Sequence, residues 1–218
     1  VMENNTKVYL GFFEQQMNES AIKLGYVISM EMESGLHVRI GRNGRTPGDV
    51  DACSAGEKSV AIFLLLDLLN SFTGIRLLFF DEVEMLDNKV WEALLKLVEE
   101  KKIDYVAMDI KNAPSRYGET AGVKKIDVMR INESVEFLKS GVVDYEFRTT
   151  LCKELHGREE IEAIGKWLSG AKRYFLQNYR ESDYVIDPRF SGYAREQLER
   201  FCEILRGKIE TVEIRGVD

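Results

Sequence analysis

The alternation of short apolar runs with longer amphipathic stretches constrains the fold of this chain more than any other feature. Apolar runs of strand length lie at residues 76–80, 105–108, 145–151, 173–177 and 212–214. Stretches of helical periodicity lie at residues 59–69, 88–101, 131–140, 158–168 and 193–206. Strand–helix alternation is typical of a mainly parallel sheet with flanking helices, so the sequence predicts an α/β fold.

The first 50 residues follow a different pattern. Residues 8–25 carry apolar side chains at helical spacing and predict an amphipathic helix that ends near Gly25. Residues 26–28 and 36–40 are strand-like around Glu33-Ser34-Gly35, which predicts a β-hairpin, and residues 41–48 form a turn-rich loop. We expect an N-terminal region at 1–100 and a C-terminal region at 101–218, either separate or joined by one continuous sheet.

Composition excludes several classes of protein. The formal net charge of -7 argues against broad binding to a nucleic-acid backbone. No apolar run approaches the roughly 20 residues that cross a bilayer, and residues 1–5 do not resemble the start of a signal peptide. The three cysteines, Cys53, Cys152 and Cys202, are far apart in the sequence, which fits a reducing cytoplasm and supplies no clustered iron–sulfur motif.

A turn of small residues and an acidic strand end form the first candidate constellation. Residues 53–59, Cys-Ser-Ala-Gly-Glu-Lys-Ser, open the long apolar helix, where backbone amides and the helix dipole favour a phosphate. The apolar strand at 76–80 then ends in Asp81-Glu82, followed by Leu86-Asp87. Two acids at the end of a strand are able to hold magnesium and activate a water molecule.

Residues 8–100 resemble the C-terminal lobe of an ATP-binding-cassette ATPase of the structural-maintenance-of-chromosomes type. The resemblance implies that Ser54 and Gly56 contact the γ-phosphate of ATP held by a partner subunit. It also implies that Asp81 supports magnesium and that Glu82 polarises the attacking water. Ala55 stands where that family usually has glycine, and the chain has no Gly-x-x-x-x-Gly-Lys-Ser/Thr phosphate loop. Neither His37 nor His156 is placed as that family's switch histidine, so at most half of an ATP site is present.

Charged and polar side chains at strand ends form the second constellation. Asp109 and Lys111 follow the strand at 105–108, while Arg148 and Gln177 lie in the strands at 145–151 and 173–177. In parallel α/β folds the carboxyl ends of the strands form the ligand face, so these groups are expected to converge. A cation suits a carboxylate and an anion suits an amine, which indicates an amino-acid-like ligand.

Residues 103–218 resemble the C-terminal half of a radical S-adenosylmethionine enzyme, of the type that activates anaerobic ribonucleoside-triphosphate reductase. The stretches that carry the resemblance are 104–111, 117–120, 146–150, 171–178, 183–188 and 212–216. The resemblance implies that Asp109 and Lys111 bind the methionine part of S-adenosylmethionine, with Arg148 and Gln177 as neighbours. It also implies a partial TIM-barrel-like fold of the C-terminal half, a ribonucleotide reductase as partner and a four-iron cluster. The Cys-x-x-x-Cys-x-x-Cys loop that binds such a cluster is absent, so we expect no activity from this chain alone.

The two resemblances overlap near residue 100. Ala55-Gly56-Glu57 also matches the Gly-Gly-Glu turn of radical S-adenosylmethionine enzymes, and the helix at 90–101 suits either family. The leading hypothesis is a radical-S-adenosylmethionine-like activating protein without its cluster loop. The alternatives are half of an ATPase site that needs a partner subunit, and a non-catalytic interaction domain.

Overall fold

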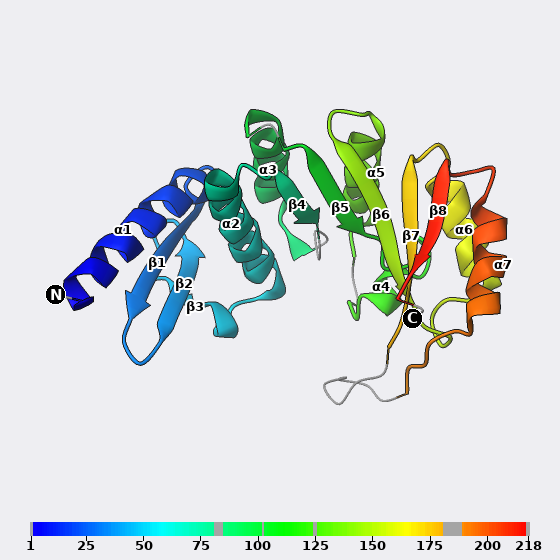
Figure 1. Cartoon of the computed structure of the whole chain (residues 1–218), viewed down its shortest axis with the longest axis horizontal. Coiled ribbons are helices and arrows are strands. Elements are labelled where there is room, and N and C mark those ends of the chain that lie inside the picture. The colour runs from blue at the N-terminus through cyan, green and yellow to red at the C-terminus, as the bar shows by residue number, and fades with distance from the viewer. Residues whose placement is uncertain (1, 81–84, 102, 124–125, 181–188, 217–218) are drawn as a thin grey trace. The chain divides into compact units, whose positions relative to one another are not determined.

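A computed structural model gives the structure of the chain and describes residues 2–80, 85–101, 103–123, 126–180 and 189–216 (Figure 1). The chain divides into two compact units, residues 1–105 and 106–218. Its strands form a three-stranded antiparallel sheet in the order β1-β2-β3 and a five-stranded parallel sheet in the order β4-β5-β6-β7-β8. This arrangement confirms the predicted α/β fold with an N-terminal helix and a β-hairpin.

The first unit begins with a helix packed on a hairpin. Its elements are α1 (Met2–Ala21), β1 (Tyr26–Met32), β2 (Leu36–Arg42), β3 (Gly48–Asp49), η1 (Val50–Ala52), α2 (Ala55–Thr73), β4 (Leu77–Phe80) and α3 (Asn88–Glu100). Asn18 of α1 fixes the helix to the hairpin, because its amide donates to the Ile28 carbonyl at 2.8 Å and accepts from the Ile28 N–H at 2.9 Å. Ile28 pairs with Ile40 across the hairpin, and both are buried.

Helix α2 is less buried than its apolar sequence suggests. Val60 and Leu64 are fully buried, whereas Ile62 and Leu69 on the other side are about half exposed. The buried carboxylate of Asp67 accepts a hydrogen bond from the Ser20 hydroxyl at 2.6 Å and lies 3.2 Å from the Lys101 ammonium. The helix therefore has one side in the core and one apolar side facing solvent, although its apolar sequence indicated a buried helix.

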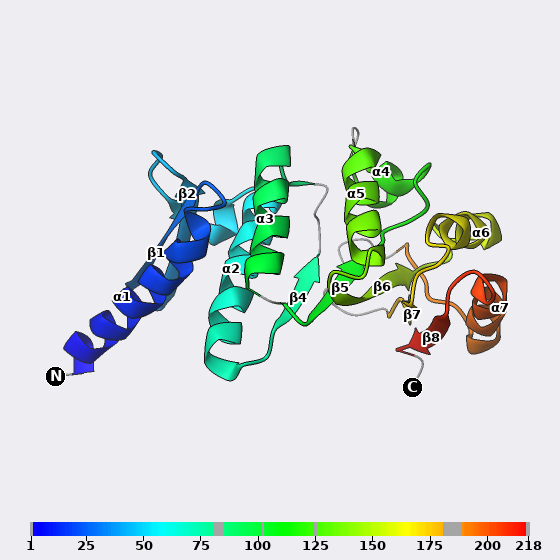
Figure 2. The ribbon, with the colours of Figure 1, turned by 90° about the horizontal axis from the view of Figure 1, so that it is seen from above.

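The second unit consists mainly of parallel strands and their connecting helices. Its elements are β5 (Tyr105–Asp109), which the unit boundary divides, α4 (Tyr117–Thr120), α5 (Val128–Lys139), β6 (Asp144–Leu151), α6 (Arg158–Trp167), β7 (Arg173–Asn178), α7 (Arg195–Leu205) and β8 (Thr211–Arg215). Strand β7 pairs in parallel with both β6 and β8. Figure 2 shows α5, α6 and α7 on one side of these strands.

The side chains of β6 alternate between two environments. Tyr145, Phe147 and Leu151 are buried, and the hydroxyl of Tyr174 on β7 donates to Thr149 at 2.7 Å. Successive side chains in a strand point to opposite faces, so the residues between them, Glu146, Arg148 and Thr150, share the other face. The helices thus cover the apolar face of this sheet, and polar side chains project from the opposite one.

The longer helices and strands predicted from the sequence are present in the structure, whereas the shortest elements were not predicted. Strand β3, the 3-10 helix η1 and helix α4 were not predicted, because two to four residues carry no detectable periodicity. Helix α1 begins before residue 8, and β3 lies at the end of the segment predicted as a loop. None of the described helices combines the length and apolar character needed to cross a membrane.

Helix α5 supplies a direct test of this packing. Leu138 is fully buried, whereas Met129 on the same helix is 73% exposed. We expect Leu138→Ala to lower the free energy of unfolding by about 2–5 kcal/mol, because it removes buried methyl groups and leaves a cavity. Met129→Ala should change it by no more than about 0.5 kcal/mol. Urea denaturation of both variants measures the difference, and equal effects would contradict this position for α5.

Candidate functional site

Three of the four predicted ligand-binding residues of the second unit lie together. Asp109 is the last residue of β5, and the Arg148 guanidinium of β6 donates to its carboxylate. The Lys111 ammonium lies 3.5 Å from the other oxygen of the same carboxylate. All three side chains are largely buried, with 20–26% of their surface exposed. Partial burial strengthens electrostatic interactions relative to water, so this cluster is a favourable place for a charged ligand.

A second ion pair lies on the same face of the sheet. Arg215 of β8 donates to both carboxylate oxygens of Glu146, at 2.8 Å and 3.0 Å. The Arg215 guanidinium also stacks over the Phe175 ring, 3.4 Å from its centroid. Glu146 is only 5% exposed. Together, Asp109, Lys111, Glu146, Arg148, Gln177 and Arg215 form what we call the polar face.

Gln177 lies further along the polar face than predicted. It pairs with Thr150 in the strand register, and its side-chain oxygen accepts from the Thr150 hydroxyl at 3.4 Å. Arg148 pairs with Phe175, two residues earlier in both strands. The structure therefore places Gln177 beside Thr150, while Arg148 contacts Asp109.

Sequence reasoning missed Glu146 and Arg215 as members of the polar face. Both belong to stretches that carry the family resemblance, but neither was singled out. The signal was the two-residue alternation along β6, where polar residues at 146, 148 and 150 interrupt a mainly apolar strand. That alternation indicates a shared face, although it does not reveal which side chain on another strand completes the pair.

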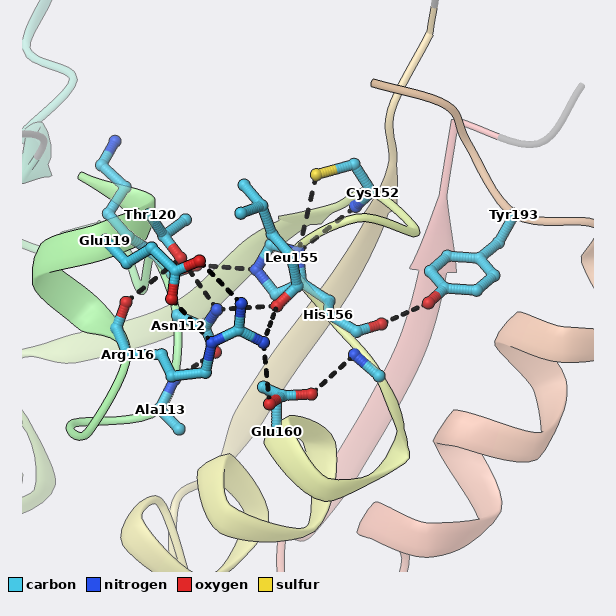
Figure 3. A network of polar contacts seen from close by, with 12 residues as sticks. Asn112, Ala113, Arg116, Glu119, Thr120, Cys152, Leu155, His156, Glu160 and Tyr193 are labelled. Carbon is cyan, nitrogen blue, oxygen red and sulfur yellow. Dashed lines mark hydrogen bonds and ion pairs between the residues drawn. The ribbon is translucent and has the colours of Figure 1, made fainter. Parts of the chain in front are cut away.

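Behind Lys111, a buried histidine joins the loop after β6 to the loop after β5 (Figure 3). His156 is 1% exposed, and its Nε2 lies 2.8 Å from the Lys111 carbonyl oxygen. Its Nδ1 lies 3.3 Å from the Cys152 backbone N–H, which donates to it. Burial lowers the pKa of His156, because the charged form loses its hydration. From the sequence, His156 was a candidate only for the switch histidine of an ATPase, and its position did not fit that role.

The cysteines do not fit an iron–sulfur cluster. Cys53 belongs to the first unit. In the second unit, Cys152 lies in the loop after β6 and Cys202 lies on α7. Burial raises the pKa of all three thiols, which disfavours the thiolate that binds iron. Among the described residues, no group of three or more His, Cys, Asp or Glu side chains is placed to hold a metal ion.

The predicted phosphate-binding turn begins α2 of the first unit. Ser54 is the N-cap residue, and its hydroxyl lies 2.8 Å from a carboxylate oxygen of Glu57, which also accepts from the Ser54 N–H at 3.0 Å. These hydrogen bonds lower the pKa of Glu57 and form a capping box. A Cβ added to Gly56 would lie 2.5 Å from the Met85 carbonyl oxygen. Asp81 and Glu82 lie outside the described residues.

Comparisons with known proteins give a distant relationship. No protein-family profile matches the chain. A Methanocaldococcus jannaschii protein named as a glycyl-radical enzyme activating enzyme is 26% identical over 136 residues, which covers 58% of this chain and 55% of that protein. The chain thus spans about half the length of the curated relative it matches.

A solved domain structure shares the fold of much of the chain. A domain of pyruvate-formate lyase-activating enzyme from Bacteroides vulgatus superposes with a TM-score of 0.51 at 15% identity, over 73% of this chain and 95% of that domain. An Smc head bound to the C-winged helix domain of ScpA gives a TM-score of 0.41 at 19% identity, over 49% of this chain and 36% of that one. The chain therefore distantly resembles a protein named as a glycyl-radical enzyme activating enzyme.

The lowered pKa of His156 predicts a pH dependence of stability. Between its folded pKa and about 6.5, the unfolded chain binds the proton that the folded chain excludes, so stability falls as pH falls. We expect this part of the pH dependence to disappear in His156→Gln, whose side chain does not titrate. Thermal unfolding at pH 7.5 and 5.5 measures it. A wild type and variant that lose stability equally on acidification would show that His156 does not titrate as its burial requires.

Proposed function

We propose that the polar face binds the amino-acid end of S-adenosylmethionine, and that the chain is a radical-S-adenosylmethionine-like protein of the glycyl-radical enzyme activating type. Its partner is a glycyl-radical enzyme, specifically an anaerobic ribonucleotide reductase. The observation that supports the proposal is the cluster of Asp109, Lys111 and Arg148 at the carboxyl end of the sheet. The distant relationship to a protein named as an activating enzyme supports the same assignment.

The cluster matches a zwitterion in both charges. Lys111 and Arg148 are donors suited to a ligand carboxylate, and the guanidinium of Arg148 has the geometry for a two-point contact. The Asp109 carboxylate is an acceptor suited to a ligand ammonium. An amino acid entering this site exchanges the internal ion pairs for equivalent pairs with the ligand, so no charge is left buried without a partner.

The proposal is restricted to binding. Radical chemistry in this family requires a four-iron cluster, and the described cysteines of the chain do not fit one. We therefore assign no radical step to this chain by itself. The residues of the polar face would hold and orient S-adenosylmethionine. That the chain is inactive alone stays a prediction from the sequence.

Isothermal titration calorimetry with S-adenosylmethionine tests the binding site. We expect Lys111→Ala to weaken binding by about tenfold to a hundredfold, because a hydrogen bond to a charged group contributes about 1.5–3 kcal/mol. Lys166→Ala removes an equal charge from an exposed position on α6 and should leave the affinity unchanged. Identical titrations for the wild type and Lys111→Ala would rule out this site.

Ligand fragments separate recognition of the amino-acid end from recognition of the rest. S-adenosylhomocysteine keeps the amino acid and should respond to Lys111→Ala as S-adenosylmethionine does. 5′-Methylthioadenosine lacks the amino acid, so its weaker binding should be the same in the wild type and the variant. If Lys111→Ala weakens the binding of S-adenosylhomocysteine and of 5′-methylthioadenosine equally, Lys111 does not contact the amino acid. If no ligand binds the wild type, the interaction-domain alternative is favoured.

A second candidate, half of an ATPase site completed by a partner, is favoured by one contact in the first unit. Gly56, in the first turn of α2, lies so close to the Met85 backbone that a methyl group would not fit. The start of α2 thus adjoins the chain just after the acidic strand end. In this proposal, Ser54 and Gly56 contact ATP held by the partner, Asp81 supports magnesium and Glu82 polarises water.

Assembly with a phosphate-loop subunit tests the second candidate. We expect Glu82→Gln to accumulate an ATP-dependent complex with such a subunit on size-exclusion chromatography, because hydrolysis no longer dissolves it. Adding Ser54→Arg should prevent the complex, since the larger side chain occupies the position of the phosphate. Assembly that is the same with and without ATP would argue against this function.

A further inference from the structure

The peptide groups that follow Asp109 form hydrogen bonds to β6 and to the loop after it. The Ile110 N–H donates to the Arg148 carbonyl at 2.8 Å, and the Ile110 carbonyl accepts from the Thr149 hydroxyl at 2.6 Å. The next carbonyl, that of Lys111, lies 2.8 Å from Nε2 of His156. Beyond Asp109, the last residue of β5, these contacts supply partners for the Ile110 N–H and for the carbonyls of Ile110 and Lys111.

The hydrogen bonds of His156 fix its tautomer. Because Nδ1 accepts the Cys152 N–H at 3.3 Å, the proton of the neutral ring is on Nε2, which donates to the Lys111 carbonyl. The Cys152 thiol lies 3.8 Å from the same Nδ1. Protonation of Nδ1 would set two donors against each other, so only the neutral ring satisfies both neighbours.

Two hydrogen bonds hold the backbone of His156 in place. The Tyr193 hydroxyl donates to the His156 carbonyl, and the His156 N–H donates to the Cys152 carbonyl at 3.0 Å. Figure 3 shows the contact of Tyr193 with His156 together with the neighbouring Asn112 and Arg116. Asn112, fully buried, donates to the Leu155 carbonyl at 3.0 Å, so the loop after β6 is tied to the loop after β5 at two successive residues.

We propose that His156 is a positioning residue for the ligand site, acting through its hydrogen bond to the Lys111 carbonyl. Lys111 presents its side chain to Asp109 on the polar face, while its carbonyl points back to the buried ring. The ammonium–carboxylate distance of 3.5 Å is longer than that of a short charge-assisted hydrogen bond. His156 sets the position of the backbone from which the Lys111 side chain extends. This inference rests on the proposed function for the identity of the ligand, but not for the placement of Lys111.

Two substitutions separate the two hydrogen bonds of the ring. The side-chain nitrogen of His156→Gln reaches the position of Nε2 and keeps the donor to Lys111, but it loses the acceptor for the Cys152 N–H. The shorter side chain of His156→Asn reaches only the position of Nδ1, so it keeps that acceptor and loses the donor. Both variants remove one buried hydrogen bond, and thermal unfolding measures what each loses in stability.

If His156 positions Lys111, ligand affinity depends on the hydrogen bond to the Lys111 carbonyl and not on the stability of the protein. In His156→Asn, we expect the NMR resonances of the Lys111 carbonyl carbon and side-chain nitrogen to shift, and affinity for S-adenosylmethionine to fall about tenfold, the size of effect that outer-shell partners have on the groups they orient. In His156→Gln, both should stay close to wild type. This rescue by the longer amide is not expected of a merely structural histidine.

The two readouts keep the proposals distinguishable. If the wild type does not bind S-adenosylmethionine, the proposed function fails, and the Lys111 resonances still decide the role of His156. The positioning role is overturned if the Lys111 side-chain resonances are unchanged in His156→Asn. It is equally overturned if affinity falls in both variants in proportion to their loss of stability.

Discussion

The arrangement of the polar face depends on how the chain satisfies its backbone hydrogen bonds after it leaves the sheet at Asp109. A buried carbonyl without a donor costs about 1–3 kcal/mol, so the segment after Asp109 favours a conformation in which the carbonyls of Ile110 and Lys111 have donors. Thr149 supplies the donor for Ile110 and itself accepts from the fully buried Tyr174. His156 supplies the donor for Lys111. Thr149 and His156 thereby hold the backbone from which a charged side chain of the polar face extends.

The polar face contributes less to folding than its number of ion pairs suggests. Burying the Glu146 carboxylate removes it from water, and its attraction to Arg215, whose side chain stays 44% exposed, often only offsets this loss. Apolar side chains of similar volume would fill the same space at least as stably. The same comparison with apolar side chains applies to the charged cluster around Asp109. The presence of such residues in the middle of a sheet is better explained by binding than by stability, and this argument supports a ligand site in the second unit.

The sequence predicted those features that depend on local periodicity or on the general geometry of parallel sheets. The main strands and helices followed from spacing, and the approach of Arg148 to Asp109 followed from their positions at neighbouring strand ends. The pair of Glu146 with Arg215 joins residues 69 apart, and His156 meets Lys111 from 45 residues away. Such partners depend on strand register and loop path, which a single sequence does not specify. Composition likewise did not reveal that one side of α2 is exposed.

The first unit shows why a plausible motif is not equivalent to a site. The hydroxyl of Ser54 is engaged by Glu57, whose lowered pKa keeps its carboxylate charged. A phosphate approaching the start of α2 would therefore meet a negative charge and would have to displace it from Ser54, losing the hydrogen bonds of the capping box. On the polar face, an amino-acid ligand leaves no charge without a partner. Its carboxylate takes the place of Asp109 as the partner of Lys111, and its ammonium takes the place of Lys111 as the partner of Asp109. The difference in electrostatics, more than the likeness of either motif to a family, makes ligand binding by the second unit the stronger interpretation.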